Sequence, residues 1–249
     1  MLQVKDVTVG FGGVKALNGL SFEVNQGEIF GVIGPNGAGK TTLLNVVSGI
    51  IRPSAGEILY RGRLVSGLPT HTITRLGVGR VFQITQPFHG LTVRENVLVG
   101  AYFGTRKSST STVDVDAILE LVGMDKLASR PVSELSVAMR KRLEFARALA
   151  LRPDLLLLDE VMAGLAPTEV DYLTGIVKRI NREGITIVMV EHVMRAVMAT
   201  CRRVLVMHLG KHLAVDAPEA VTRDNRVIEV YLGRRYAERM AGTAGEKRG

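Results

Sequence analysis

The chain has 249 residues, of which 46% are hydrophobic and 22% charged, a composition typical of a globular protein with ample material for a core. Its formal net charge is +8, but it has no tryptophan and only 5% aromatic residues, so we expect no nucleic-acid partner. Its single cysteine, Cys201, excludes an internal disulfide and a multi-cysteine zinc site, and we expect it to be buried.

Apolar runs and the character of the terminal residues indicate where the protein is located. No apolar run approaches the roughly 18 residues of a membrane-spanning helix, and the N-terminal residues lack the apolar stretch of a signal peptide. We therefore expect a cytoplasmic protein. Residues 234–249 carry part of the excess positive charge in a stretch that contains Gly and Ala, and we expect a flexible basic tail there.

The first third of the chain is predicted to be rich in strands. Residues 2–33 alternate apolar and polar side chains in short runs broken by Gly and Asn, and 56–60 has the pattern of a further strand. After Gly34 the apolar positions change to helical spacing in TTLLNVVSGI. The local order is therefore strand, glycine loop, helix.

The rest of the chain divides into a helical part and an alternating part. Residues 85–150 contain helical patterns around a polar stretch at 104–112, and we expect an inserted helical subdomain there. From 154 onward, strands at 155–159, 185–190, 203–207 and 211–215 surround a helix over 168–182, which Thr168 and Asp171 are expected to begin as a capping box. This alternation predicts an α/β core around a mostly parallel sheet.

A phosphate-binding loop is predicted between the first buried strand and its helix. Residues 34–41, Gly-Pro-Asn-Gly-Ala-Gly-Lys-Thr, match G-x-x-x-x-G-K-[ST], in which backbone N–H groups and the helix N-terminus face phosphate oxygens. Lys40 is expected to reach the β- and γ-phosphates, and Thr41 to bind Mg²⁺. The residues predicted to bind ATP here are Gly34, Pro35, Asn36, Gly37, Ala38, Gly39, Lys40, Thr41 and Thr42.

A pair of acids follows a second buried strand. LLLLDE at 155–160 places Asp159 and Glu160 at the carboxyl end of that strand, where α/β sheets present ligand-binding groups. We expect Asp159 to hold Mg²⁺ and Glu160 to act as the general base toward the attacking water. Acids after an apolar strand also begin helices, so this interpretation depends on the phosphate loop.

Further motifs lie in the order found in ABC ATPases, and the chain resembles that family along nearly its whole length. Gln83, in GRVFQ, matches the glutamine that senses Mg²⁺ and the attacking water, and His192 matches the switch histidine. Residues 135–139 resemble the signature motif, and 163–167 resemble the D-loop. The remaining nucleotide contacts implied by the resemblance are Phe11, stacking on adenine, and Ser136, Val137 and Ala138 of the signature.

The resemblance implies a complete architecture and a set of partners. The expected fold is an α/β P-loop NTPase core with a mostly parallel sheet, an N-terminal antiparallel β subdomain and the helical insertion, spanning 1–233. ATP and Mg²⁺ are the implied cofactors. The implied partners are a second ABC ATPase subunit, two transmembrane permease subunits and an extracytoplasmic solute-binding protein. The implied location is the cytoplasmic face of the cell membrane, as a peripheral subunit.

Several segments point to a subtype. These segments look most like those of the ATPases of branched-chain amino acid importers; they are FGGVKAL, GVGRVFQ, AGLAPTE, VEHVMRAVM and VIEVYLG. Urea and amide importers share this pattern, and lipopolysaccharide-export ATPases share it less closely. A non-transport ABC regulatory ATPase remains an alternative. A GTPase would need an NKxD motif, which the sequence does not contain.

Each matched residue has a simpler explanation, and several positions depart from the family. Phe11 alone could be a core aromatic, and His192 alone a structural histidine. In the signature, Val137, Ala138 and Met139 replace the usual Gly-Gly-Gln, and we expect the Cβ of Ala138 to crowd the partner's γ-phosphate. The other two departures are Val161 in place of the usual proline and Ala166 in place of Asp or Asn.

Overall fold

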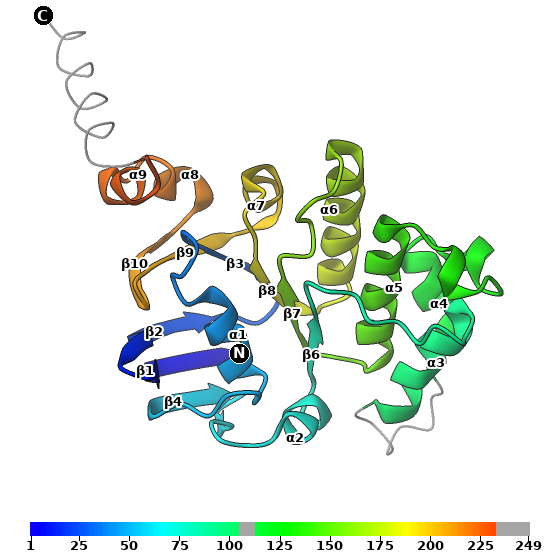
Figure 1. Cartoon of the computed structure of the whole chain (residues 1–249), viewed down its shortest axis with the longest axis horizontal. Coiled ribbons are helices and arrows are strands. Elements are labelled where there is room, and N and C mark those ends of the chain that lie inside the picture. Colours follow the sequence, from blue (N-terminus) through cyan, green and yellow to red (C-terminus); the bar gives the residue numbers. More distant parts are fainter. Residues whose placement is uncertain (105–112, 233–249) are drawn as a thin grey trace, which may run out of the picture.

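A six-stranded sheet forms the centre of the molecule (Figure 1), and three of its strands are buried at every position. The computed structural model describes residues 1–104 and 113–232. The strand order is β10-β9-β3-β8-β7-β6, and β10 pairs antiparallel with β9 while all other neighbours are parallel. This confirms the predicted mostly parallel sheet. The strands are β3 (Ile29–Ile33), β6 (Val78–Val81), β7 (Leu155–Asp159), β8 (Thr186–Val190), β9 (Arg203–His208) and β10 (Lys211–Asp216).

A smaller antiparallel sheet covers one side of this core, as predicted for the N-terminal part. Its order is β2-β1-β4-β5. The strands are β1 (Leu2–Phe11), β2 (Val14–Val24), β4 (Ala55–Tyr60) and β5 (Arg63–Leu64). Helix α1 (Lys40–Val47) lies between the two sheets, because its Leu43 and Leu44 join one apolar cluster with Leu17 of β2 and Leu157 of β7. The helix that follows the phosphate loop is thereby packed on both sides.

The opposite face of the large sheet is covered by helices. Leu156 and Leu158 alternate with Leu155 and Leu157 along β7, so the two pairs enter different apolar clusters on the two faces of the sheet. The helix-covered face carries α3 (Val93–Phe103), α4 (Val115–Leu121), α5 (Val137–Ala150), α6 (Pro167–Arg182) and α7 (Met194–Thr200). The helices of the stretch predicted as an insertion therefore share the core of the sheet.

The remaining described elements are short. They are α2 (Thr70–Arg75), the 3₁₀ turns η1 (Asp125–Leu127) and η2 (Val132–Glu134), α8 (Pro218–Val221) and α9 (Asn225–Leu232). Within the described residues, no helix is both long and apolar enough to cross a membrane. The predicted flexible tail, 234–249, lies outside the described residues.

The start of α6 corrects one expectation. Thr168 and Asp171 form no capping box, because the helix begins at Pro167 with Ala166 as its N-cap, and that N-cap makes no side-chain hydrogen bond. Proline presets the backbone angle of the first helical position and so moves the start one residue earlier. Asp171 instead accepts a hydrogen bond from Arg195 of α7 at 2.7 Å. The carboxylate therefore links α6 to α7 and does not cap the start of α6.

Candidate nucleotide-binding and hydrolysis site

The predicted motifs meet at the carboxyl edge of the large sheet. The phosphate loop, residues 34–41, follows β3, while Asp159 ends β7 and Glu160 comes next in the chain. His192 follows β8, which lies between β3 and β7 in the sheet. Gln83 follows the edge strand β6. Parallel strands bring these ends to one edge, although the residues are up to 158 positions apart in the chain.

The phosphate loop is held close to the neighbouring chain. Gly39 has φ +100°, and a Cβ there would lie 2.3 Å from the carbonyl oxygen of Ala16 at the start of β2. Only glycine fits this conformation and this approach. The Lys40 Nζ donates to the carbonyl oxygens of Gly34 at 2.8 Å and Pro35 at 3.0 Å. The ammonium therefore lies against the loop it belongs to, with Thr41 exposed beside it.

Burial lowers the pKa of Lys40, and attraction to Glu160 and then to Asp159 partly offsets that effect. The positive charge of Lys40 therefore interacts electrostatically with the two acids at the carboxyl end of β7. An anion placed among these groups would favour the charged form of Lys40.

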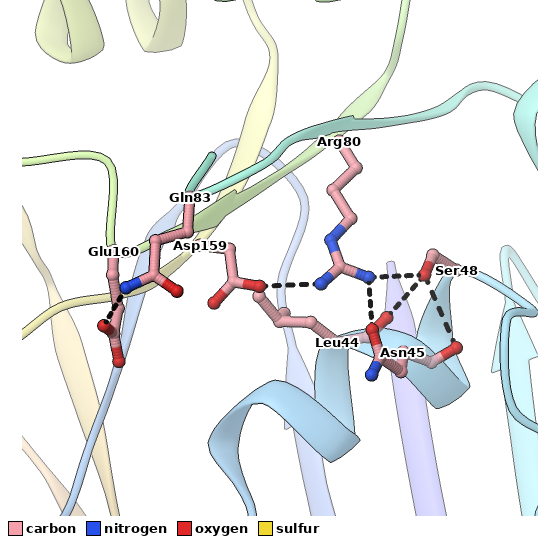
Figure 2. Close-up of polar contacts among 7 residues, drawn as sticks. All are labelled: Leu44, Asn45, Ser48, Arg80, Gln83, Asp159 and Glu160. Atoms are coloured by element: carbon pink, nitrogen blue, oxygen red, sulfur yellow. Dashed lines mark hydrogen bonds and ion pairs between the residues drawn. The ribbon is translucent and has the colours of Figure 1, made fainter. Parts of the chain in front are cut away.

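Asp159 belongs to a buried polar network with α1 (Figure 2). Its Oδ2 accepts a hydrogen bond from Arg80 of β6 at 2.7 Å, and both side chains are at most 6% exposed. The same guanidinium donates to Asn45 Oδ1 at 2.8 Å and Ser48 Oγ at 3.0 Å, both on or next to α1. Asp159 Oδ1 is buried and has no hydrogen-bond partner among the described residues. A carboxylate oxygen left open in this way fits a hard cation such as Mg²⁺.

Glu160 lies between the two residues predicted to act with it. Gln83 Nε2 donates to Glu160 Oε2 at 2.9 Å, and His192 Nε2 lies 2.6 Å from Glu160 Oε1. The backbone of Glu160 has φ +48°, an uncommon conformation for a residue other than glycine. Three segments that follow β6, β7 and β8 thus converge on one carboxylate.

An open cavity of about 670 Å³ joins this site to the helices. Thr41, Gln83 and Asp159 line it, as do Phe103 of α3 and Glu144 of α5. Among the described residues that line this cavity, none belongs to the signature segment and none is Phe11. The structure therefore brings the phosphate loop, Gln83, Asp159, Glu160 and His192 together and leaves the signature apart.

The signature segment, residues 135–139, begins α5. Ser136 is the N-cap, and its hydroxyl oxygen accepts the Met139 N–H at 3.3 Å. Val137 is 66% exposed whereas Ala138 is 8% exposed. The methyl of Ala138 thus packs inward and Val137 is the side chain that faces outward, while the expected crowding of a partner's γ-phosphate by Ala138 stays a prediction.

Phe11 ends β1 and is 52% exposed, so it is not a core aromatic. Its strand partner is Val14, across the turn at Gly12 and Gly13. Because β2 begins in this hairpin and approaches Gly39 at Ala16, the hairpin that carries Phe11 rests on the phosphate loop. Its ring is thus free to contact a ligand.

Three charged residues at the site were not singled out from the sequence. Arg80 lies within a short buried strand, Lys141 lies on the buried face of α5 between Ala138 and Phe145, and Glu191 directly follows β8. A charged residue where the pattern demands an apolar one is the signal that could have identified each of them.

The comparisons with known proteins agree with this geometry. A model of the ABC transporter family matches residues 17–163. The high-affinity branched-chain amino acid transport ATP-binding protein LivG of Salmonella typhimurium is 37% identical, covering 94% of this chain and 98% of that protein. The lipopolysaccharide export system ATP-binding protein LptB of Haemophilus influenzae is 33% identical, covering 95% and 98%.

A solved structure has the same fold. The crystal structure of an ATP-binding cassette of an ABC transporter in its ADP conformation has a TM-score of 0.85 and 29% identity, covering 94% of this chain and 99% of that one. Motifs, site geometry and relatives of nearly equal length all lead to one family. The chain belongs to the ABC transporter family and is one of its ATP-binding, ATP-hydrolysing subunits.

Proposed function

We propose that this chain powers an importer of branched-chain amino acids or related small polar solutes, from the cytoplasmic face of the membrane. The support for the solute class is the similarity to LivG, which extends over 94% of the chain. The observation that carries the catalytic role is the placement of the Glu160 carboxylate between Gln83 and His192, at 2.9 and 2.6 Å.

In this proposal each group of the site has one task. Lys40 and the backbone N–H groups of residues 34–42 bind the phosphates, and Phe11 stacks on adenine. Thr41, Asp159 and Gln83 would hold Mg²⁺, which when bound neutralises charge on the phosphate oxygens. Glu160 accepts the proton of a water whose oxygen attacks the γ-phosphorus as the bond to ADP breaks. His192 orients the Glu160 carboxylate and the water.

A second ATPase subunit follows from the separation of the two nucleotide-binding segments. Ser136 and Val137 are exposed at the start of α5 and lie outside the cavity that contains Thr41 and Asp159. We propose that they contact the nucleotide of a partner subunit, whose own signature completes this chain's site. Backbone N–H groups at a helix start suit a terminal phosphate.

The permease is proposed to bind an apolar docking surface beside Gln83. Its members are exposed large side chains, from 44% for Phe88 to 82% for Tyr102, and three of them, Phe82, Ile84 and Phe103, line the cavity. The docking surface consists of Phe82, Ile84, Phe88, Leu98, Tyr102 and Phe103. Exposed apolar side chains gathered in this way mark protein interfaces.

The docking surface is tied to the signature helix. Arg147 of α5 donates to the Gln86 carbonyl at 2.9 Å, and its guanidinium lies 4.8 Å from the centre of the Phe88 ring. Glu144 of α5 accepts the Gln86 N–H at 3.2 Å. Movement of α5 would therefore be transmitted to the surface where the permease binds.

Purification of the full chain from membranes in mild detergent tests the proposal. We expect two co-purifying permease subunits and a second ATPase, and uptake of labelled leucine in proteoliposomes only when an extracytoplasmic solute-binding protein is added. Similarity to LptB supports a second candidate, lipopolysaccharide export. Stimulation of the ATPase by lipopolysaccharide, without any solute-binding protein, would favour that candidate and contradict import.

A further inference from the structure

The backbone at Glu160 is strained and needs support. A non-glycine residue at φ +48° is energetically unfavourable and persists only where its surroundings hold it. The Glu160 N–H donates to the Val190 carbonyl at 2.9 Å, which fixes the chain before the strained residue. The chain after it is the loop of residues 161–165, here called the post-base loop, and this loop has to be fixed as well.

Lys141 holds the post-base loop from the side of α5. Its side chain is buried, and Nζ donates to the carbonyl oxygens of Val161 at 2.7 Å and Ala163 at 2.9 Å. The aliphatic stem spans from the signature helix to the loop. Burial lowers the pKa of Lys141, and attraction to Glu191 opposes that shift.

Glu191 holds the same loop from the side of β8. It is fully buried, and Oε1 accepts the Met162 N–H at 2.9 Å. Its second oxygen, Oε2, is buried and has no hydrogen-bond partner among the described residues. The next residue along the chain is His192, whose ring contacts Glu160 at 2.6 Å. The anchor of the loop and the contact to the carboxylate thus come from adjacent residues.

The two charged side chains therefore bind three consecutive residues of the loop: a carbonyl, an N–H and a carbonyl. Buried charges seldom add stability over apolar side chains of the same volume, so their presence calls for another role. We propose that Lys141 and Glu191 are positioning residues that clamp the post-base loop and so hold the Glu160 carboxylate against its water. This inference rests on the proposed role of Glu160 as the base.

The test compares Lys141→Met with Arg142→Met in the full chain. Arg142 is the next residue of α5 and a cation as well, but it lies 3.7 Å from the Tyr172 ring and pairs with Glu169 of α6. We expect Lys141→Met to lower kcat by about 10- to 100-fold, the cost of a small misplacement of a reacting group, with ATP affinity and KM within about twofold. Arg142→Met should keep kcat within about twofold.

Conservative variants separate positioning from folding. Lys141→Arg keeps two N–H donors for the loop carbonyls, and Glu191→Gln keeps an acceptor for Met162, so both should retain most of kcat. Glu191→Met removes that acceptor and should lose about as much as Lys141→Met. If Lys141→Met does not fold by circular dichroism, Glu191→Met carries the test alone. An unchanged kcat in the folded variant, or an equal loss in Arg142→Met, overturns the proposal.

Combination with Glu160→Gln shows whether the clamp acts through the base. In that background, Lys141→Met should cause no further loss of single-turnover hydrolysis, because the group it positions is already gone. A further loss of 10-fold or more would overturn the proposal and leave the role of Glu160 intact. Normal turnover in Glu160→Gln alone would instead overturn the site assignment, and the clamp with it.

Discussion

The two walls of the site cavity differ in what they present. One wall is polar and buried: Arg80, Asp159 and Asn45 form hydrogen bonds of 2.7–2.8 Å between β6, β7 and α1. The other wall exposes apolar side chains, with Ile84 at 74% and Phe103 at 68%. The first wall is held together by hydrogen bonds within this chain and leaves Asp159 Oδ1 open, whereas the second wall is the surface that we propose binds another chain.

This difference indicates how the work is divided. Buried charge networks are rigid and keep reacting groups in place, whereas an exposed apolar wall supplies the free energy of binding to a partner. Gln83 lies between the two, since it contacts Glu160 at 2.9 Å and lines the cavity next to Phe82 and Ile84. The chemistry and the docking surface are therefore linked through Gln83, and also through Arg80, whose guanidinium lies 4.7 Å from the centre of the Phe82 ring.

The largest effect should come from removing the base on the polar wall. Glu160→Gln should reduce ATP turnover by about 10²- to 10⁴-fold while ATP binding remains, because only proton acceptance is lost. Turnover by phosphate release and ATP affinity by fluorescent nucleotide titration measure the two effects. Loss of both together would mean that Glu160 supports the fold of the site rather than the reaction.

Lys40→Ala should affect binding instead. The loop loses the one ammonium that lies on the phosphate loop, so ATP affinity should fall about 100-fold, or roughly 3 kcal/mol. Isothermal titration with ATP and Mg²⁺ measures this change, and Lys5→Ala, on the exposed surface of β1, is the control. An unchanged dissociation constant would reject the assignment of the phosphate loop.

Arg80→Met should destabilise the polar wall even without nucleotide. It leaves Asp159 buried without its ion-pair partner, so the free energy of unfolding should fall by about 3 kcal/mol. Chemical denaturation of the nucleotide-free chain measures the loss. The double variant Arg80→Met, Asp159→Asn should recover part of it, because the uncompensated charge is removed. Simple additivity of the two variants would show that Arg80 and Asp159 are not coupled.

Glu191 should make stability depend on pH. Its pKa is raised to about 7, mainly by burial; hydrogen bonds from the Met162 and His192 backbone N–H groups and attraction to Lys141 oppose this shift, and repulsion from Glu160 adds to it. Because the folded state binds the proton more tightly than the unfolded state, Glu191 stabilises the fold fully at a pH below about 4.5, its usual pKa. This stabilisation is lost as the pH rises through about 7, its pKa in the folded state. Glu191→Gln should therefore gain stability relative to the natural chain between pH 5 and pH 8, by on the order of 2 kcal/mol. Denaturation curves with the same pH dependence in both proteins would contradict this.

The smallest effect is expected on the apolar wall. Ile84→Ala should weaken binding to the permease complex by about 10-fold, since one buried apolar contact of an interface contributes 1–2 kcal/mol. Ile50→Ala is the control, because Ile50 is exposed as well, at 50%, but lies outside the docking surface. Affinity is measured by titrating the chain onto permease in nanodiscs. Equal losses in both variants would show that the docking surface is misplaced.

Much of the fold was predictable because it depends on local patterns. Apolar runs predicted the buried strands that end in Ile33, Asp159 and Val190. The helical spacing of apolar residues predicted the helix at 137–150. The start of α6 was mispredicted because Pro167 competes with a capping box for the first turn. Local signals are reliable where one interaction dominates, and they fail where two compete over one residue.

The sequence by itself determined which groups carry the chemistry, since a phosphate loop, an acid pair after a strand and a histidine after the next strand are defined by type and spacing. Only the tertiary structure decided which residues support them. Arg80 and Asp159 are 79 positions apart, and Lys141 and Val161 are 20 apart. No pattern along the chain pairs such residues, because their contact depends on the order of strands in the sheet and on the packing of α5 against it.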